Sequence, residues 1–401
     1  MVHGHGDALE RLLSRERSVQ TPPRPCGSAR GRYTARSTTA ARICARAGLA
    51  LAGPRRPYLT PRGPMAEPRF DVAGIGNAIV DVLAHADDAF LEAQGLPKGG
   101  MTLIDEARAE TLYGAMGPGV EISGGSAANT IAGLASLGAR VAYIGKVKDD
   151  ALGRIFRHDI TASGVYYPTV PLTEGPATAR SLILVSPDAE RTMNTFLGAC
   201  TCLGPQDIDE SVIRDAAITY VEGYQWDMPA AKDAIRLAAD HTRAAGRRFA
   251  LSLSDPFCVG RHKADFIELL DNHVDILFAN ESEALALTDT SSIDAATQAL
   301  QGRCAIAAIT RGSQGCRVVL PDTVCDVPAH PVTTLVDTTG AGDLFAAGFL
   351  WGLCRGYAPA DCARVGAVTA AEVVSHVGAR PAVDSLAALV NDVLGLNGTP
   401  A

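Results

Sequence analysis

The residues best suited to chemistry lie near the C-terminal end, in the run Asp337-Thr338-Thr339-Gly340-Ala341-Gly342-Asp343. The apolar, β-branched stretch 332–336 before it predicts a strand, and the apolar run 344–353 after it has helical spacing. The first N–H groups of a helix lack partners within it, and the helix dipole is positive there. Because residues 340–342 are small, their amides could approach an anion, with Asp343 beside it as a base. This pattern predicts phosphoryl transfer to a hydroxyl, although an N-terminal Asp that only caps the helix remains an alternative.

Two other glycine-containing turns fail as nucleotide motifs. Gly74-Ile75-Gly76 begins a dinucleotide fingerprint, but the third glycine would fall at Ile79. Gly145-Lys146 suggests a Walker loop, yet the pattern needs glycine at 140 and Ser or Thr at 147, which are Arg140 and Val147. In the apolar run after Asp343, Gly348 and Gly352 lie four residues apart, which predicts close packing against a neighbouring helix.

The chain has 401 residues, of which 47% are hydrophobic, so it can form a large core as one α/β domain or two smaller ones. Residues 1–64 contain twelve Arg, no Lys and three acids, a net charge of +9, so the remainder carries −17. An acidic body argues against nucleic acid as a partner. No apolar run approaches a membrane-spanning length, which argues against a transmembrane helix.

The basic segment 1–64 is rich in Arg and Pro and lacks periodic apolar spacing, so we expect a leader outside the fold. We favour translation from Met65, which would make 65–401 the folded domain. A transit peptide is the second interpretation, and a basic arm for nucleic acid or membrane the third. The chain has ten cysteines and no CxxC, so we expect buried thiols in a reducing compartment, the cytoplasm.

The run at 337–343 resembles the signature of the ribokinase-like (PfkB) kinases of sugars and nucleosides. Three further stretches match the family's motifs in order, over residues 70–380: Gly124-Gly125-Ser126-Ala127-Ala128-Asn129, Asn280-Glu281-Ser282-Glu283 and Thr310-Arg311-Gly312-Ser313-Gln314-Gly315. The resemblance implies an α/β fold, with a doubly wound, mostly parallel sheet flanked by helices and a small β-sheet lid. Strands and helices that alternate regularly from residue 217 onward predict such a sheet independently. The paired strands predicted at 178–185 and 191–196 would belong to the lid.

The resemblance also implies an acceptor site and a nucleotide site. Asp343 would be the base, with the amides of residues 340–342 around the developing charge and Arg191 near the transferring phosphate. The residues that would bind the acceptor through polar groups are Asn77, Asp81, Gly125, Ser126 and Asn129. The residues that would bind ATP are Asn280, Thr310, Gly312, Gly315, Gly340 and Gly342. Asn280 and Glu283 would organise Mg²⁺ through water, and Asp337 and Thr339 could hold K⁺.

Within the family, the motifs at 76–81 and 124–129 look closest to those of adenosine kinases, which implies transfer of phosphate from ATP to a nucleoside 5′-hydroxyl. Apolar walls for a purine would come from Met101, Leu103, Met193 and Phe196. A sugar kinase of the ribokinase or fructokinase type is an alternative, and a catalytically silent scaffold is an alternative of another class. The lid leaves both a monomer and a lid-to-lid homodimer open.

Overall fold

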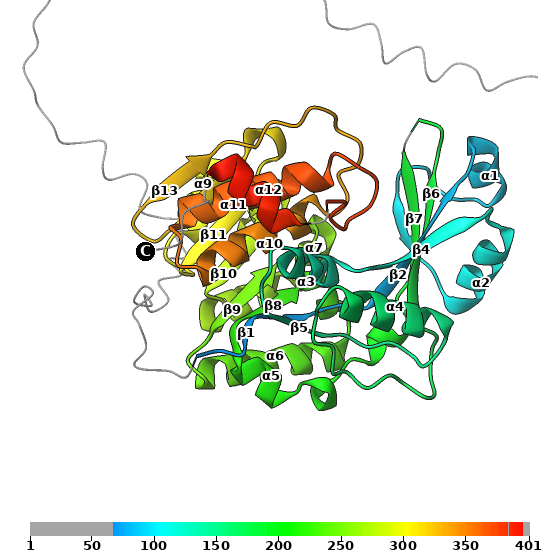
Figure 1. The fold of residues 1–401 in the computed structure, drawn as a ribbon, viewed down its shortest axis with the longest axis horizontal. Helices are drawn as coiled ribbons and strands as arrows, with labels where there is room; N and C mark the ends of the chain where they lie inside the picture. Colours follow the sequence, from blue (N-terminus) through cyan, green and yellow to red (C-terminus); the bar gives the residue numbers. More distant parts are fainter. Residues whose placement is uncertain (1–66, 189, 384, 396–401) are drawn as a thin grey trace, which may run out of the picture. The chain divides into compact units, whose positions relative to one another are not determined.

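The computed structural model describes residues 67–188, 190–383 and 385–395. Its main sheet has eight strands in the order β13-β12-β11-β10-β9-β8-β1-β5 (Figure 1). The six strands from β11 to β5 are parallel, and β12 and β13 add an antiparallel edge. The strands are β1 (Phe70–Ile75), β5 (Val141–Ile144), β8 (Ala216–Glu222), β9 (Arg248–Ser252), β10 (Ile276–Asn280), β11 (Ile306–Thr310), β12 (Cys316–Val319) and β13 (Val324–Val327).

Successive residues of these strands enter hydrophobic cores on opposite faces of the sheet. Val72 and Tyr220 belong to one core, and their neighbours Ala73 and Val221 belong to the other. This confirms the predicted sheet that is covered by helices on both faces. The first core includes α3 (Ser126–Ser136), α4 (Ala151–Ala162), α10 (Ala341–Cys354), α11 (Pro359–Val373) and α12 (Leu386–Leu394). The second includes α5 (Glu210–Arg214), α6 (Pro229–Ala244), α7 (Pro256–Asn272), α8 (Glu281–Thr288) and α9 (Ile293–Leu300).

A second, five-stranded sheet in the order β3-β7-β6-β2-β4 forms the lid (Figure 1). The chain passes from β1 into β2 through residues 76–78, so the lid is joined directly to the main sheet. The lid elements are β2 (Ile79–His85), α1 (Asp88–Ala93), β3 (Met101–Leu103), α2 (Glu106–Ala115), β4 (Gly119–Gly124), β6 (Ala179–Val185) and β7 (Arg191–Phe196). The predicted pairing of β6 with β7 is confirmed as antiparallel.

Helix α10 packs against α11 at distances that leave no room for a side chain. A Cβ on Gly348 would lie 2.6 Å from Thr369 Oγ1 and 2.8 Å from the Gly366 backbone. A Cβ on Gly352 would lie 2.9 Å from Cys362 Sγ. The close packing predicted from the spacing of these two glycines is therefore confirmed.

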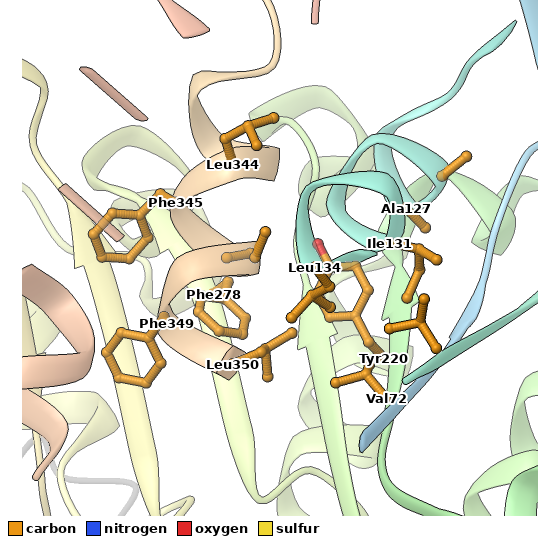
Figure 2. Packing of buried hydrophobic residues seen from close by; sticks show 14 of the residues in the cluster. Val72, Ala127, Ile131, Leu134, Tyr220, Phe278, Leu344, Phe345, Phe349 and Leu350 are labelled. Atoms are coloured by element: carbon orange, nitrogen blue, oxygen red, sulfur yellow. The ribbon is translucent and has the colours of Figure 1, made fainter. Parts of the chain in front are cut away.

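The opposite side of α10 packs on the sheet and on α3, as Figure 2 shows for its buried hydrophobic side chains. The Phe349 ring lies 5.5 Å from that of Phe278 on β10, nearly edge to face. Leu344 fills the space beside Gly133 of α3, where a Cβ would lie 2.6 Å from Leu344 Cδ1. Packing on three sides thus fixes the first turn of α10, which carries Asp343, relative to the sheet.

Some expectations are changed by the structure or lie outside it. The strand predicted at 332–336 is wrong: this segment has no regular structure, and Leu335 is 67% exposed. The amides of Val336 and Asp337 both donate to the Val374 carbonyl, so no strand pairs with this segment. The predicted leader, residues 1–64, lies outside the described residues. In the described part, the eight cysteines are free thiols, five of them buried, and no helix is long and apolar enough to cross a bilayer.

Candidate active site

The phosphate-binding turn predicted at 337–343 leads into α10. Gly340 caps the helix with φ of +78°, a left-handed conformation that favours glycine. The Ala341 N–H donates to the Thr338 carbonyl over 3.2 Å, whereas the amides of Gly340 and Gly342 have no acceptor among the described residues. Two of the three predicted amides are therefore available to an anion at this helix N-terminus.

Asp343 is held in place by two donors from the first turns of α3. Ser126 Oγ donates to one carboxylate oxygen over 2.6 Å, and Asn129 Nδ2 donates to the other over 3.1 Å. Burial raises the pKa of Asp343 to about 6, opposed by these two hydrogen bonds and by the charge of Arg380. A fixed carboxylate with a pKa just below neutral is suited to accept a proton at physiological pH.

Asp81 on β2 belongs to the same group of charges. Burial raises the pKa of Asp81 to about 7, Arg380 and Arg191 lower it, and the charge of Asp343 adds to the increase. A Cβ on Gly124 would overlap the Asp81 carboxylate, so only glycine fits beside it. The structure therefore brings the predicted hydroxyl reader, on β2 of the lid, and the predicted base, in the first turn of α10, into one site.

Glu222, at the end of β8, organises the two acceptor-binding loops and was not predicted. One carboxylate oxygen accepts from the Asn77 N–H over 2.9 Å, and the other accepts from the Ala127 N–H over 2.6 Å. Burial raises the pKa of Glu222 to about 7. The Asn77 side-chain oxygen also accepts from Gln225 Nε2 over 2.9 Å. The sequence signal was present, because Glu222 is an acid within an apolar strand, at the strand end where such sheets bind ligands.

Gly125, predicted to lie against the acceptor, is also required to be glycine by the backbone around it. Gly125 has φ of +95°, and a Cβ there would overlap the Asn77 carbonyl oxygen. The loop at 124–125 and the loop at 76–78 therefore pack backbone to backbone. Glu222 and this contact together set the position of α3, and thus of Ser126 and Asn129.

Arg191 and Asp337, predicted for different roles, form an ion pair between the lid and the turn. Arg191 Nη2 lies 2.6 Å from Asp337 Oδ2; Asp337 is buried and Arg191 is partly buried. Asp337 Oδ1 accepts from the Thr339 N–H and hydroxyl, and Oδ2 accepts from the Gly378 N–H over 2.9 Å. Asp337 and Thr339 are thus arranged around an arginine, and their role toward K⁺ stays a prediction. Arg191 remains close enough to the turn to meet a phosphate there.

The nucleotide-site residues predicted on β10 and β11 lie side by side. Asn280 pairs with Thr310 in the parallel register at the carboxyl ends of the two strands. Asn280 and Glu283 form a reciprocal cap of α8, with the Glu283 N–H donating to Asn280 Oδ1 and the Asn280 N–H donating to Glu283 Oε2, both over 2.8 Å. Burial raises the pKa of Glu283 to about 7. The cap accounts for both residue types, so their role toward Mg²⁺ stays a prediction.

The glycines of the predicted nucleotide loop have backbone reasons for their positions. Gly312 and Gly315 have φ of +56° and +86°, both in the left-handed region. A Cβ on Gly315 would overlap the Val327 carbonyl oxygen, so the loop lies directly against β13. The turn follows directly after Thr310, the last residue of β11, and the resemblance implies that a nucleotide binds at this end of the strand.

Three of the four predicted apolar wall residues share one face of the lid. Met101 pairs with Met193, and Leu103 belongs to the same strand two residues further on, so alternation gives all three the same face. Met101 and Leu103 are 49% and 54% exposed, so this face presents accessible apolar side chains. The prediction for Phe196 is wrong, because it is an odd number of residues from Met193 and alternates to the opposite, buried face.

Arg380, beyond α11, completes the cluster and was also missed. Its Nε donates to Asn129 Oδ1 over 2.8 Å. No motif points to it, because a single Arg after Gly378-Ala379 has no fixed spacing to Asp343. Its place in the site follows from this hydrogen bond, which joins the segment after α11 to α3.

Residues 106–386 match the family described as pfkB family carbohydrate kinase. The chain belongs to this family. A solved structure of an adenosine kinase from Sinorhizobium meliloti is 52% identical, covers 81% of this chain and 99% of its own, and has a TM-score of 0.76. A probable sugar kinase from Rhizobium etli is 46% identical over 82% of this chain and 99% of its own, with a TM-score of 0.77. Adenosine kinase 1 from Arabidopsis thaliana is 28% identical over 78% of this chain and 97% of its own.

Membership of the pfkB family makes the chain a phosphotransferase that acts on a hydroxyl group, and it implies ATP and generally Mg²⁺. Among the described residues, no group of three or more His, Cys, Asp or Glu could hold a metal ion. Mg²⁺ commonly keeps several waters and binds through substrate phosphates. The donor set near Asn280 and Glu283 fits an ion held in that way, through water and phosphate.

Proposed function

We propose that this pfkB kinase phosphorylates the 5′-hydroxyl of a nucleoside, with adenosine as the preferred acceptor. The observation that supports it is the cluster of Asp81, Asn129 and Asp343, in which a hydroxyl reader and a base are coupled. Asp81 has no hydrogen-bond partner among the described residues, so both carboxylate oxygens can accept from vicinal hydroxyls. Asn129 has one N–H and one lone pair left after its bonds to Asp343 and Arg380.

In this proposal the chain's own residues orient the acceptor, stabilise the developing charge and accept one proton. Asp81 and Asn129 would hold the ribose so that its 5′-hydroxyl faces Asp343, which would accept the hydroxyl proton as the oxygen attacks the γ-phosphorus of ATP. The amides of Gly340 and Gly342 would stabilise the charge on the transferring group. Mg²⁺, when bound, would offset the charge of the donor phosphates.

Adenosine is favoured over a free sugar for two reasons. The Sinorhizobium relative, at 52% identity, is described as an adenosine kinase. In addition, Met101, Leu103 and Met193 present an apolar face, which suits a flat base better than sugar hydroxyls. The Rhizobium relative, described as a probable sugar kinase, keeps a sugar acceptor as the second candidate. The silent scaffold is disfavoured because Asp343 is present and held by two donors.

The proposal is tested with a panel of acceptors and Mg-ATP, in which turnover is measured as the release of ADP. Adenosine should exceed inosine, ribose and fructose in kcat/KM. 2′-Deoxyadenosine should lose about 1–3 kcal/mol of transition-state stabilisation, because a buried carboxylate oxygen then lacks its partner. Asp81→Ala should remove most of the difference between adenosine and its deoxy analogue. Ribose or another free sugar as the best acceptor would overturn the nucleoside proposal and leave the role of Asp343 intact.

A further inference from the structure

A chain of two hydrogen bonds joins Arg380 to the candidate base. Arg380 Nε donates to Asn129 Oδ1 over 2.8 Å, and Asn129 Nδ2 donates to Asp343 Oδ2 over 3.1 Å. The three residues come from the segment after α11, from α3 and from α10. The second Asp343 oxygen is held separately by Ser126. The hydrogen-bond connection from Arg380 to the base therefore runs through Asn129.

Arg380 and Asp343 together decide which way the Asn129 amide points. A guanidinium can only donate, so the amide oxygen must point toward Arg380 and the NH₂ group must point toward the carboxylate. The reversed amide would place N–H against N–H at Arg380 and oxygen against a carboxylate at Asp343. Without Arg380, nothing else in the described residues bonds the Asn129 oxygen, and only the Asp343 carboxylate then favours this direction of the amide.

The charge of Arg380 also bears on both carboxylates of the site. Its guanidinium lowers the pKa of Asp81 and that of Asp343, and burial lowers its own pKa to about 10. The other charged groups near it are Arg191, which acts on Asp81 from the lid, and Asp159 on α4, which acts on Arg380 itself. Arg380 Nη2 is buried and has no hydrogen-bond partner among the described residues. Burying a charged N–H group without a hydrogen-bond partner costs folding free energy, which favours a functional reason for its position.

We infer that Arg380 is a positioning residue for phosphoryl transfer, which aims Asp343 at the acceptor hydroxyl through Asn129. The inference rests on the proposed role of Asp343 as the base. It goes beyond that role because it assigns catalytic dependence to a residue outside every motif in the sequence. Arg380 also borders an open cleft of about 610 Å³ between β4, α3 and α4. It therefore does not simply fill space in the hydrophobic core.

The test compares Arg380→Gln and Arg380→Lys with the natural protein, using Mg-ATP and its best acceptor. In the Gln variant, kcat should fall about 10- to 100-fold, the effect of a base that is no longer well aimed, while KM for ATP changes less than about threefold. The acid limb of kcat/KM should move to higher pH by about 0.5–1 unit, because the cation that favours the ionised carboxylates is gone. The Lys variant keeps the charge but lacks the planar Nε–H donor, so its acid limb should stay in place while kcat remains low.

Arg364→Gln, at an exposed position of α11 that pairs with Asp361, is the matched control and should leave kcat and the pH profile unchanged. An Arg380→Gln variant with kcat within twofold of the natural value and an unmoved acid limb would overturn the inference. A second outcome would also overturn it: both the Gln and the Lys variant lose kcat and melt at a lower temperature, but both keep the natural pH profile. That combination indicates a structural defect. Asp343→Asn separates the two proposals: if it stays active, the base itself is wrong, and if it is inactive while Arg380→Gln is normal, only the role of Arg380 fails.

Discussion

Replacing Gly340 by alanine tests how the turn before α10 is built. Gly340 has φ of +78°, and a Cβ there would lie 2.8 Å from Ala379 Cα and 3.0 Å from the Ala379 carbonyl oxygen. Both are backbone atoms, so no flexible side chain can move aside. The clash would push the N-terminus of α10 away from the segment that carries Gly378 and Arg380.

The expected loss of stability has two parts. A non-glycine residue in the left-handed region costs roughly 1–2 kcal/mol. Forcing an extra methyl group into a packed site costs about 1–3 kcal/mol more. Gly340→Ala should therefore lower the free energy of unfolding by about 2–5 kcal/mol, and the melting temperature by roughly 5–15 °C for a domain of this size.

Thermal and urea unfolding measure this, with Gly342→Ala as the matched control two residues away. Gly342 is helical, and a Cβ there meets no atom within 4 Å, so its alanine variant should be as stable as the natural protein or up to about 1 kcal/mol more stable. Equal melting temperatures for Gly340→Ala and the natural protein would refute the steric argument. An equal loss in Gly342→Ala would show that the helix N-terminus is sensitive for another reason.

Two further predictions concern pH and the leader. Burial raises the pKa of Asp343 to about 6 and that of Asp81 to about 7, and both carboxyls must be ionised to act. The value of kcat/KM should therefore fall as the pH drops from 8 through this range. An acid limb below pH 5 would contradict both assignments. The same raised values mean that the folded state binds protons more readily than the unfolded chain between about pH 4 and 7, so these two carboxyls should favour unfolding as the pH rises through that window. A protein that starts at Met65 should match the full chain in melting temperature and kcat, and a loss of several degrees or of turnover would show that residues 1–64 pack on the domain.

The catalytic motif could be predicted from sequence because its residues are close together along the chain. Asp343 and the glycines at 340 and 342 occupy one turn, and short-range rules for helix N-termini apply to them directly. Alternation of strands and helices likewise gave the parallel sheet. Asp81 and Asn129 required the resemblance, since 48 residues of chain separate them.

The errors and omissions have physical causes as well. Residues 332–336 have strand-like side chains but no strand beside them, and pairing is decided by tertiary structure. Phe196 was placed on the wrong face although it lies three residues from Met193 in one predicted strand, so the alternation of side chains along a strand already separated the two. Glu222 and Arg380 act through contacts 95 and 251 residues away in sequence, beyond any local pattern.

The central claim is that Asp343 accepts the acceptor's proton, and Asp343→Asn tests it most directly. The amide keeps the size and an oxygen for the Ser126 hydroxyl but cannot take up a proton. Steady-state turnover with Mg-ATP and adenosine should fall by about 10²–10⁴ in kcat, the usual range for loss of a general base, while ATP binds with unchanged affinity by calorimetry. A variant that folds, binds ATP and turns over at close to the natural rate would contradict the account.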